Sequence, residues 1–219
     1  MKKENYNRRH FLNTTAKLSL TTTGAMILPS SKAFNQPSKN SFEEERNVFG
    51  PRKGFSPQIS TLVSMMDWMR YTILRPVKGL SVKDLDFVFD ENSNSIGAML
   101  WHLAATERYY QLNTFENLRW GSWSYEIKQE WDVPMNLGDM GRKKIKGNNI
   151  GFYLDKLKEV RENTLKELAK RDDKWLLAID EGWGWGPTNN YCKWFHVVEH
   201  ESNHNGQIKW LMKRLPSKN

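Results

Sequence analysis

Three of the five histidines in this 219-residue chain lie four residues apart near its C-terminus, at His196, His200 and His204. On an α-helix that interval places side chains on neighbouring turns of one face, where imidazole nitrogens can converge on a single metal ion. Residues 200–204 also read H-E-x-x-H, the zinc motif of many metalloproteases. The residue types therefore predict metal chemistry, and the rest of the chain must decide which kind.

The literal protease motif lacks its third ligand. In metalloproteases of this type that ligand lies downstream, whereas the fifteen residues after His204 include no His, Asp or Glu. An upstream ligand is needed instead, and His102 is the only other histidine after residue 33. We predict a metal site formed by His102, His200 and His204, with His196 as an alternative ligand and open positions for water or substrate. A zincin-type protease is disfavoured.

The face that the C-terminal helix should bury carries side chains at steps of three and four. These are Val197, His200, His204, Gln207, Leu211 and Leu215. At about 100° per residue, His204 lies near the centre of this face, whereas Glu201 and His196 fall at opposite edges. Two buried imidazoles without an ion would leave ring nitrogens unpaired, at a cost of about 1–3 kcal/mol each. The pair therefore favours metal binding over a structural role.

Glu201 lies next to a predicted ligand and is a candidate acid–base group. A structural hydrogen bond or ion pair is the alternative role for this side chain. Cys192 is the only cysteine, so the chain can form no internal disulfide. We interpret Cys192 as an inert thiol at the start of a helix, with a reactive thiol as the alternative.

Four long helices are predicted to position these residues. Apolar side chains recur at helical spacing over residues 56–75, 93–112, 149–171 and 188–215. Ser56 and Pro57 mark the start of the first helix, and Ser81–Asp84 can cap a short turn after it. No stretch shows a persuasive strand pattern, so we expect an all-α four-helix bundle.

The segment between the second and third helices, residues 115–148, is long enough to cross the length of the bundle. Those two helices would then run parallel, which gives an up-down-down-up arrangement. His102 lies on the second helix in a stripe of mostly small side chains, which leaves room for a ligand. The tryptophans of the crossover and of Gly182–Gly186 are expected to anchor loops to the core or to line a mouth.

The N-terminal residues resemble a twin-arginine (Tat) export signal. Arg8 and Arg9 precede an aromatic-aliphatic step, and Ser31–Ala33 is a small-x-small cleavage site. The apolar run between them, Leu18–Leu28, is shorter than the about 20 residues that span a bilayer. We expect a signal over residues 1–33, a flexible linker over 34–54 and one folded domain over 55–216. The protein would be periplasmic or extracellular, without an integral membrane anchor.

The formal net charge of +8 belongs mostly to the expected signal. Without residues 1–33 the chain loses six basic residues and one acidic residue, which leaves 27 basic and 24 acidic side chains. The one short basic cluster that remains, Arg142–Lys146, has no aromatic residue within it and is interpreted as a solvated loop. No nucleic-acid partner is expected.

Two motifs resemble the DinB/YfiT-like superfamily of metal-binding four-helix bundles. Residues 95–107, S-I-G-A-M-L-W-H-L-A-A-T-E, resemble its histidine with an acidic residue five positions later. Residues 200–208, H-E-S-N-H-N-G-Q-I, resemble its H-E-x-x-H-x-G-Q signature, and the likeness covers residues 55–215. The resemblance implies that the three predicted ligands bind a divalent metal in an up-down-down-up bundle. Relatives of this kind include thiol-dependent transferases and isomerases that use bacillithiol or mycothiol.

The leading functional hypothesis is a metal-dependent enzyme whose ion activates a water or a thiol, for hydrolysis or group transfer on a small molecule. The alternative is a non-catalytic bundle whose metal stabilises the fold or senses a ligand, and which could form a homodimer through an exposed helix face. An open coordination position beside a pocket would favour the enzyme. Imidazole suits zinc, nickel, copper and iron alike, so the sequence leaves the metal open.

Overall fold

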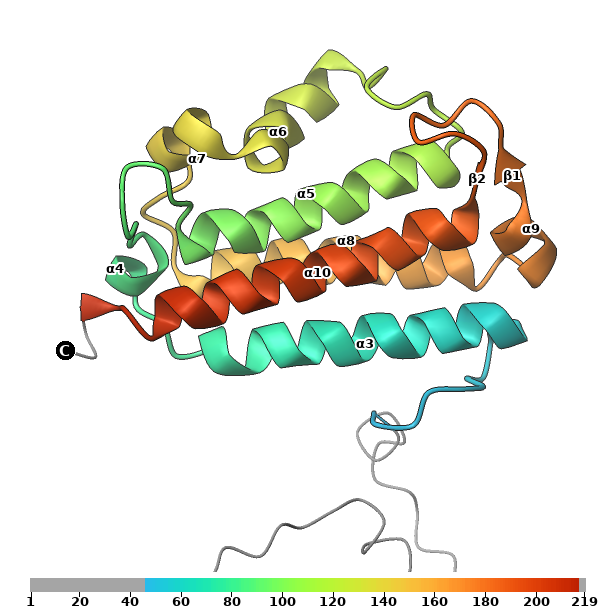
Figure 1. Ribbon diagram of the computed structural model, residues 1–219, viewed down its shortest axis with the longest axis horizontal. Coiled ribbons are helices and arrows are strands. Elements are labelled where there is room, and N and C mark those ends of the chain that lie inside the picture. The colour runs from blue at the N-terminus through green and yellow to red at the C-terminus, as the bar shows by residue number, and fades with distance from the viewer. Residues whose placement is uncertain (1–45, 217–219) are drawn as a thin grey trace, which may run out of the picture. The chain divides into compact units, whose positions relative to one another are not determined.

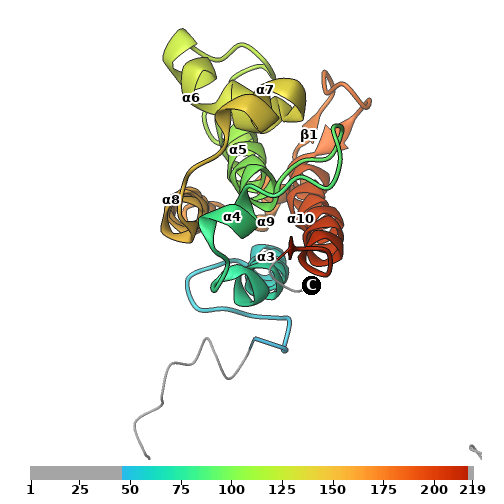
Figure 2. The same ribbon diagram turned by 90° about the vertical axis from the view of Figure 1, so that its left-hand side faces the viewer.

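Four long helices form the body of the structure, a computed structural model that describes residues 46–216 (Figure 1). They are α3 (Pro57–Val77), α5 (Ile96–Thr114), α8 (Ile150–Leu168) and α10 (Asn190–Met212). Helices α8 and α10 each pack against both α3 and α5, an arrangement that Figure 2 shows nearly end-on. The all-α prediction is confirmed. The expected signal, residues 1–33, and most of the expected linker lie outside the described residues.

Side-chain caps begin three of the long helices. The side-chain oxygens of Ser95, Asn149 and Asn189 accept hydrogen bonds from backbone N–H groups three residues further on, at 3.2, 3.1 and 2.8 Å. Each such cap supplies a partner for an otherwise unpaired donor and contributes about 1 kcal/mol. Within residues 46–216, no helix is long and apolar enough to cross a membrane.

The first turn of α3 is capped by a residue that lies far along the chain rather than by Ser56, which precedes the helix. Ser56 makes no side-chain cap, although Pro57 occupies the first helical position as expected. The carboxylate of Asp173 accepts instead from the backbone N–H of Gln58 at 3.1 Å and of Ile59 at 3.3 Å. Asp173 begins the short helix α9 (Asp173–Leu177), so a distant acidic residue meets the positive end of α3 and ties the two elements together.

The crossover between α5 and α8 contains two helices that the sequence did not predict, α6 (Tyr125–Asn136) and α7 (Gly138–Lys144). They meet at a sharp bend, where Leu137 and Gly138 both have positive φ angles of 54° and 61°. Helix α6 packs against α5. The basic cluster expected in a loop lies largely in the last turn of α7, where Arg142 donates to the carboxylate of Asp139. That expectation was wrong for residues 142–144, because cations at a helix C-terminus complement its negative end.

Three shorter elements complete the described chain. Helix α4 (Val82–Leu85) begins at Ser81, whose side chain and that of Asp84 form the expected capping box. Strands β1 (Ile179–Asp180) and β2 (Thr188–Asn189) pair antiparallel and hold the ends of the intervening turn together. This hairpin lies directly before α10.

The buried face of α10 is wider than predicted. Glu201 lies within this face and not at its edge. Its buried side chains are Lys193, Trp194, Val197, Val198, Glu201, His204, Asn205, Ile208 and Leu211. Glu201, which was placed at an edge, is 1% exposed, whereas Gln207 is exposed. The face is wide because α10 packs against both α3 and α5. The predicted stripe of side chains at steps of three and four covers only part of this buried surface.

Candidate metal centre

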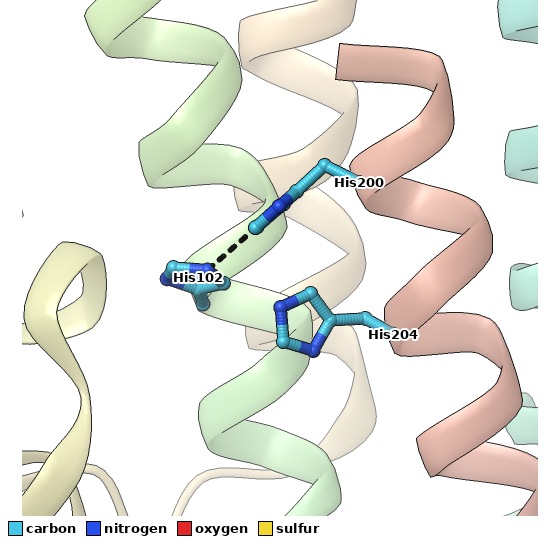
Figure 3. Close-up of side chains that lie close together, drawn as sticks. All are labelled: His102, His200 and His204. Atoms are coloured by element: carbon cyan, nitrogen blue, oxygen red, sulfur yellow. Dashed lines mark hydrogen bonds between the residues drawn. The ribbon is translucent and has the colours of Figure 1, made fainter. Parts of the chain in front are cut away.

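Three histidines from two helices converge between α5 and α10 (Figure 3). His102 comes from α5, and His200 and His204 come from successive turns of α10. The Nε2 atoms of His102 and His200 lie 2.8 Å apart, and one ring nitrogen from each of the three residues lies within 4.8 Å of the others. His102 and His204 are buried and His200 is half-buried. We call these three residues the histidine triad.

A backbone carbonyl of α6 fixes the orientation of His102. The Nδ1 of His102 lies 2.9 Å from the carbonyl oxygen of Pro134. A carbonyl can only accept, so Nδ1 carries the proton and Nε2 presents a lone pair towards the other two histidines. The carbonyl can serve this purpose because α6 ends two residues later, at Asn136, where the last carbonyls of a helix have no intrahelical donors.

Burial favours the neutral form of all three imidazoles of the triad. Burial, followed by the nearby histidines, lowers the pKa of His200 to about 3, and burial followed by His102 lowers that of His204 to about 4. Burial also lowers the pKa of His102, although the Pro134 carbonyl opposes this shift. Neutral imidazoles keep the lone pairs that bind a metal.

A divalent cation fits the donor set that these residues present. Each of the three side chains offers an imidazole nitrogen, a ligand type that zinc and other divalent metals accept. Ligand nitrogens of a tetrahedral zinc site lie about 3.4 Å apart for bonds of about 2.1 Å. The spacing of the triad brackets this value, from 2.8 Å for the closest pair to at most 4.8 Å. Small side-chain rotations would therefore suffice to hold an ion.

His196 occupies a different environment from the triad. Its Nδ1 lies 3.2 Å from the carboxylate of Glu199, and its ring meets the rings of Trp185 and Tyr110 at centroid distances of 5.1 and 5.9 Å. Its nitrogens are not among those that converge in the triad. The role of an alternative ligand remains a prediction for this residue.

One charged side chain from each long helix forms a buried charge cluster between the helices. Arg70 of α3 and Arg161 of α8 bond to Glu107 of α5, each with a closest contact of 2.8 Å. The same arginines bond to Glu201 of α10, each with a contact of 2.9 Å. None of the four residues is more than 9% exposed. We call this group the four-helix charge cluster, and its formal charges cancel.

Further hydrogen bonds support this cluster, although the Oε2 of Glu201 is buried without a partner among the described residues. Arg70 donates to the carbonyl of Leu157 and Arg161 to that of Met66, both at 2.9 Å, and the hydroxyl of Thr164 donates to Glu107 at 2.6 Å. Burial alone would raise the pKa of Glu107, but the two arginines outweigh it and hold this pKa at about 2. Glu107 lies on the helix of His102 and Glu201 directly follows His200. The cluster therefore fixes how the two ligand-bearing helices face each other.

A cleft of about 1120 Å³ reaches the triad at His200. Its lining also includes His196, and Thr106 one helical turn after His102. Aromatic residues form much of the remaining wall, from the segment before α6 and from the turn between β1 and β2. One member of the triad thus borders a space that is large enough for a small molecule.

Comparison with known protein families agrees with this architecture. The family model of the mycothiol-S-transferases matches residues 61–215. The chain belongs to this family. It is a DinB/YfiT-like family, so the likeness inferred from the two histidine motifs is confirmed. No curated protein matches the chain at a significant level.

The match to the family spans all three histidines of the triad and all four members of the charge cluster. Sequence reasoning named Glu201 and included Glu107 as the acidic residue of the first motif, but it missed Arg70 and Arg161 and the pairing of all four. Arg70 lies between Met66 and Ile73 on the apolar face of its helix. A single charge within an apolar stripe was the signal that could have identified it. The structure shows Glu201 in an ion pair, the role considered as its alternative, and shows Cys192 exposed.

Proposed function

We propose that this protein is a divalent-metal-dependent thiol transferase that acts on a small molecule. One observation carries the proposal: the cleft meets the histidine triad at His200, so a metal held there would face a space open to substrates. Membership of the mycothiol-S-transferase family supports a thiol of the mycothiol type as one of the two substrates. A hydrolytic reaction on the same metal is the second possibility that the triad allows.

The residues of the triad and their supports have distinct parts in this proposal. His102, His200 and His204 would hold the ion, which when bound lowers the pKa of a thiol and favours the thiolate. The carbonyl of Pro134 keeps the proton of His102 on Nδ1, so that Nε2 is free to bind. The four-helix charge cluster holds α5 and α10 in register, and we assign Glu201 this positioning role in preference to proton transfer.

A non-catalytic metal-stabilised bundle is the competing proposal. A closed site with every histidine nitrogen satisfied by the protein would support it. The cleft at His200 favours the enzyme instead, because a metal held by the triad would face a space open to substrates.

Metal content and thiol consumption test the proposed function. Wild-type protein purified without a histidine tag should carry about one equivalent of divalent metal and should consume mycothiol when an electrophile is supplied. His200→Ala should lose the metal, whereas His196→Ala should retain it, because its nitrogens lie outside the converging group. A wild type without stoichiometric metal would overturn the proposal. Metal without thiol consumption would favour the non-catalytic bundle.

We also propose that the bundle follows the up-down-down-up order. The long segment that carries α6 and α7 between α5 and α8 supports this order, since it can return the chain to the end of the bundle where α5 began. Spin labels at the starts of α5 and α8 would then lie closer together than labels at the start of α5 and the end of α8. The reverse result would contradict the topology.

Export by the twin-arginine route is a separate proposal, supported by the arginine pair and the cleavage site within residues 1–33. Compartments outside the cytoplasm are oxidising and deplete free thiols, so export and thiol transfer must be tested independently. Fractionation of cells that express the full chain should yield a shortened protein outside the cytoplasm. A full-length protein confined to the cytoplasm would contradict export.

A further inference from the structure

The cleft beside the triad has a wall of aromatic rings that the proposed metal chemistry does not use. It is formed by Tyr110 of α5, Trp120 of the segment before α6, Trp183 and Trp185 of the turn between β1 and β2, and His196 of α10. Trp120 and Trp183 meet at 5.3 Å and 86°, and Trp183 and Trp185 at 5.5 Å and 89°. Trp185 in turn contacts His196 at 5.1 Å. Each ring braces the next edge to face, so the wall is formed before a ligand arrives.

Two indoles of this wall are uncovered. Trp185 is 59% exposed and Trp120 is 39% exposed, although both line the same cleft. The turn that carries Trp183 and Trp185 reads G-W-G-W-G, so indoles are the only side chains between its glycines. Figure 1 shows this turn at the end of the bundle where the segment after α5 also lies. Exposed apolar surface gathered at a cleft is typical of a binding site.

The polar groups of the cleft are mostly committed to the fold. The Nζ of Lys193 donates to Asp180 at 2.7 Å and to Asn113 at 3.0 Å, and it lies 4.2 Å from the ring centre of Trp183. The side-chain amide of Asn190 donates to a backbone carbonyl at 3.0 Å. A hydroxyl-rich ligand that bound to these groups would have to displace the bonds that they already make. Apart from the indole N–H of Trp183, which is buried without a partner among the described residues, the wall offers mainly the faces of its rings.

The charges that line the cleft indicate which class of ligand the ring faces can bind. The face of an indole is electron-rich and attracts either a cation or an electron-poor ring. The lining includes two cations, Arg119 and Lys193, and one carboxylate, Asp180, which is already paired with Lys193. A cationic ligand would therefore meet a net positive cleft, whereas a neutral electron-poor ring would not be repelled.

We propose that this wall binds a planar, electron-poor aromatic molecule, stacked on Trp120 and Trp185 next to the triad. The inference rests on the proposed thiol transfer in one respect: electron-poor rings that carry a leaving group are electrophiles for thiols. In such a transfer the thiol sulfur forms a bond to a ring carbon, and the leaving group departs with its bonding electrons. The thiol proton passes to solvent. Binding of the ring itself requires neither the metal nor the thiol.

Titration of the full chain with 1,3-dinitrobenzene tests the binding step, observed through the indole N–H resonances of 15N-labelled tryptophans. The resonances of Trp120, Trp183 and Trp185 should shift and saturate. The resonance of Trp210, which is 43% exposed outside this cleft, should not shift. Trp185→Ala should weaken binding about tenfold, since one stacked ring contributes on the order of the corresponding 1.4 kcal/mol, whereas Trp210→Ala should leave the dissociation constant unchanged.

Three probes of other chemical classes test whether the wall prefers an electron-poor ring. Methyl β-glucoside tests a hydroxyl-rich ring, tetramethylammonium a cation, and 1,3-dimethoxybenzene an electron-rich ring. The proposal is overturned if any of them binds as tightly as 1,3-dinitrobenzene, or if Trp210 shifts as much as Trp185. Titrations with and without EDTA should agree. If the aromatic probe binds but the protein holds no metal, the proposed transferase is wrong and the aromatic site is supported. If the protein holds metal but does not bind the probe, the aromatic site is wrong and the proposed metal site is supported.

Discussion

At the residue scale, Glu107 illustrates how far a buried charge depends on its partners. Replacing it with glutamine leaves Arg70 and Arg161 buried with half of their compensating charge. Loss of one partner of a buried ion pair costs about 3–5 kcal/mol, so Glu107→Gln should lower the free energy of unfolding by this amount at neutral pH. Urea unfolding followed by circular dichroism measures the change.

The exposed pair of Lys158 and Glu162 provides the matched control for this substitution. These side chains are 71% and 66% exposed and lie 3.8 Å apart. Glu162→Gln should therefore change the free energy of unfolding by no more than about 0.5 kcal/mol. Equal losses of unfolding free energy in the Glu162→Gln and Glu107→Gln variants would mean that burial does not determine how much the charge cluster stabilises the fold.

The contribution of Glu107 to the free energy of unfolding should be lost over a defined range of acidic pH. Its pKa is about 2 in the folded protein against 4.5 for an ordinary glutamate, because the arginines outweigh the opposing effect of burial. A depressed folded pKa contributes stability that is fully present above pH 4.5 and is lost as the pH falls towards 2. The difference between wild type and Glu107→Gln should shrink across that range. A constant difference down to pH 3 would be incompatible with the ionised cluster.

At the element scale, the approach of α5 to α8 depends on a glycine. A Cβ atom on Gly97 would lie 2.7 Å from both Cζ and Oη of Tyr153, whose side chain is fully buried. Gly97→Ala should therefore destabilise the protein by about 1–3 kcal/mol, the usual cost of overpacking a core. A Cβ atom on Gly206 of α10 would meet no other atom within 4 Å, and Gly206→Ala should stabilise by about 0.5–1 kcal/mol.

Urea unfolding measures the free energy of unfolding of these two glycine variants. A double-mutant cycle tests whether contact with Tyr153 is the cause of the loss in Gly97→Ala. In a Tyr153→Leu background, Gly97→Ala should cost less than it does in the wild type, because the contacting ring is absent. The same cost in both backgrounds would show that Tyr153 is not the obstacle.

The four long helices were predictable because their apolar side chains recur over many turns. Helices α6 and α7 were not, because α6 contains Pro134 and buries only Trp131 and Pro134, so its periodic signal is weak. Its place depends on packing against α5 instead. The same non-local packing supplies the carbonyl that orients His102, a contact between residues 32 positions apart that no local pattern encodes.

At the scale of the whole molecule, the sequence could predict which histidines meet but not what holds their helices together. The three histidines are few, specific in chemistry and regularly spaced, so elimination identified them. The charge cluster draws one residue from each long helix, and arginines and glutamates are too common to be paired without knowing how the helices pack. Glu201 was placed at an edge for this reason, because one helix considered alone does not reveal that two neighbours cover it.

A metal in the triad would join α5 to α10 across about a hundred residues of chain, so metal binding should be coupled to global stability. An ion that binds only the folded state stabilises it by about 2.7 kcal/mol at a free concentration of 100 times the dissociation constant. For a domain of this size that corresponds to a rise of about 5–10 °C in Tm. Zinc added to EDTA-treated protein should produce this rise in the wild type and in His196→Ala. It should have no such effect in His204→Ala, whose remaining two histidines cannot complete the site, and an equal rise in His204→Ala would place the bound zinc elsewhere.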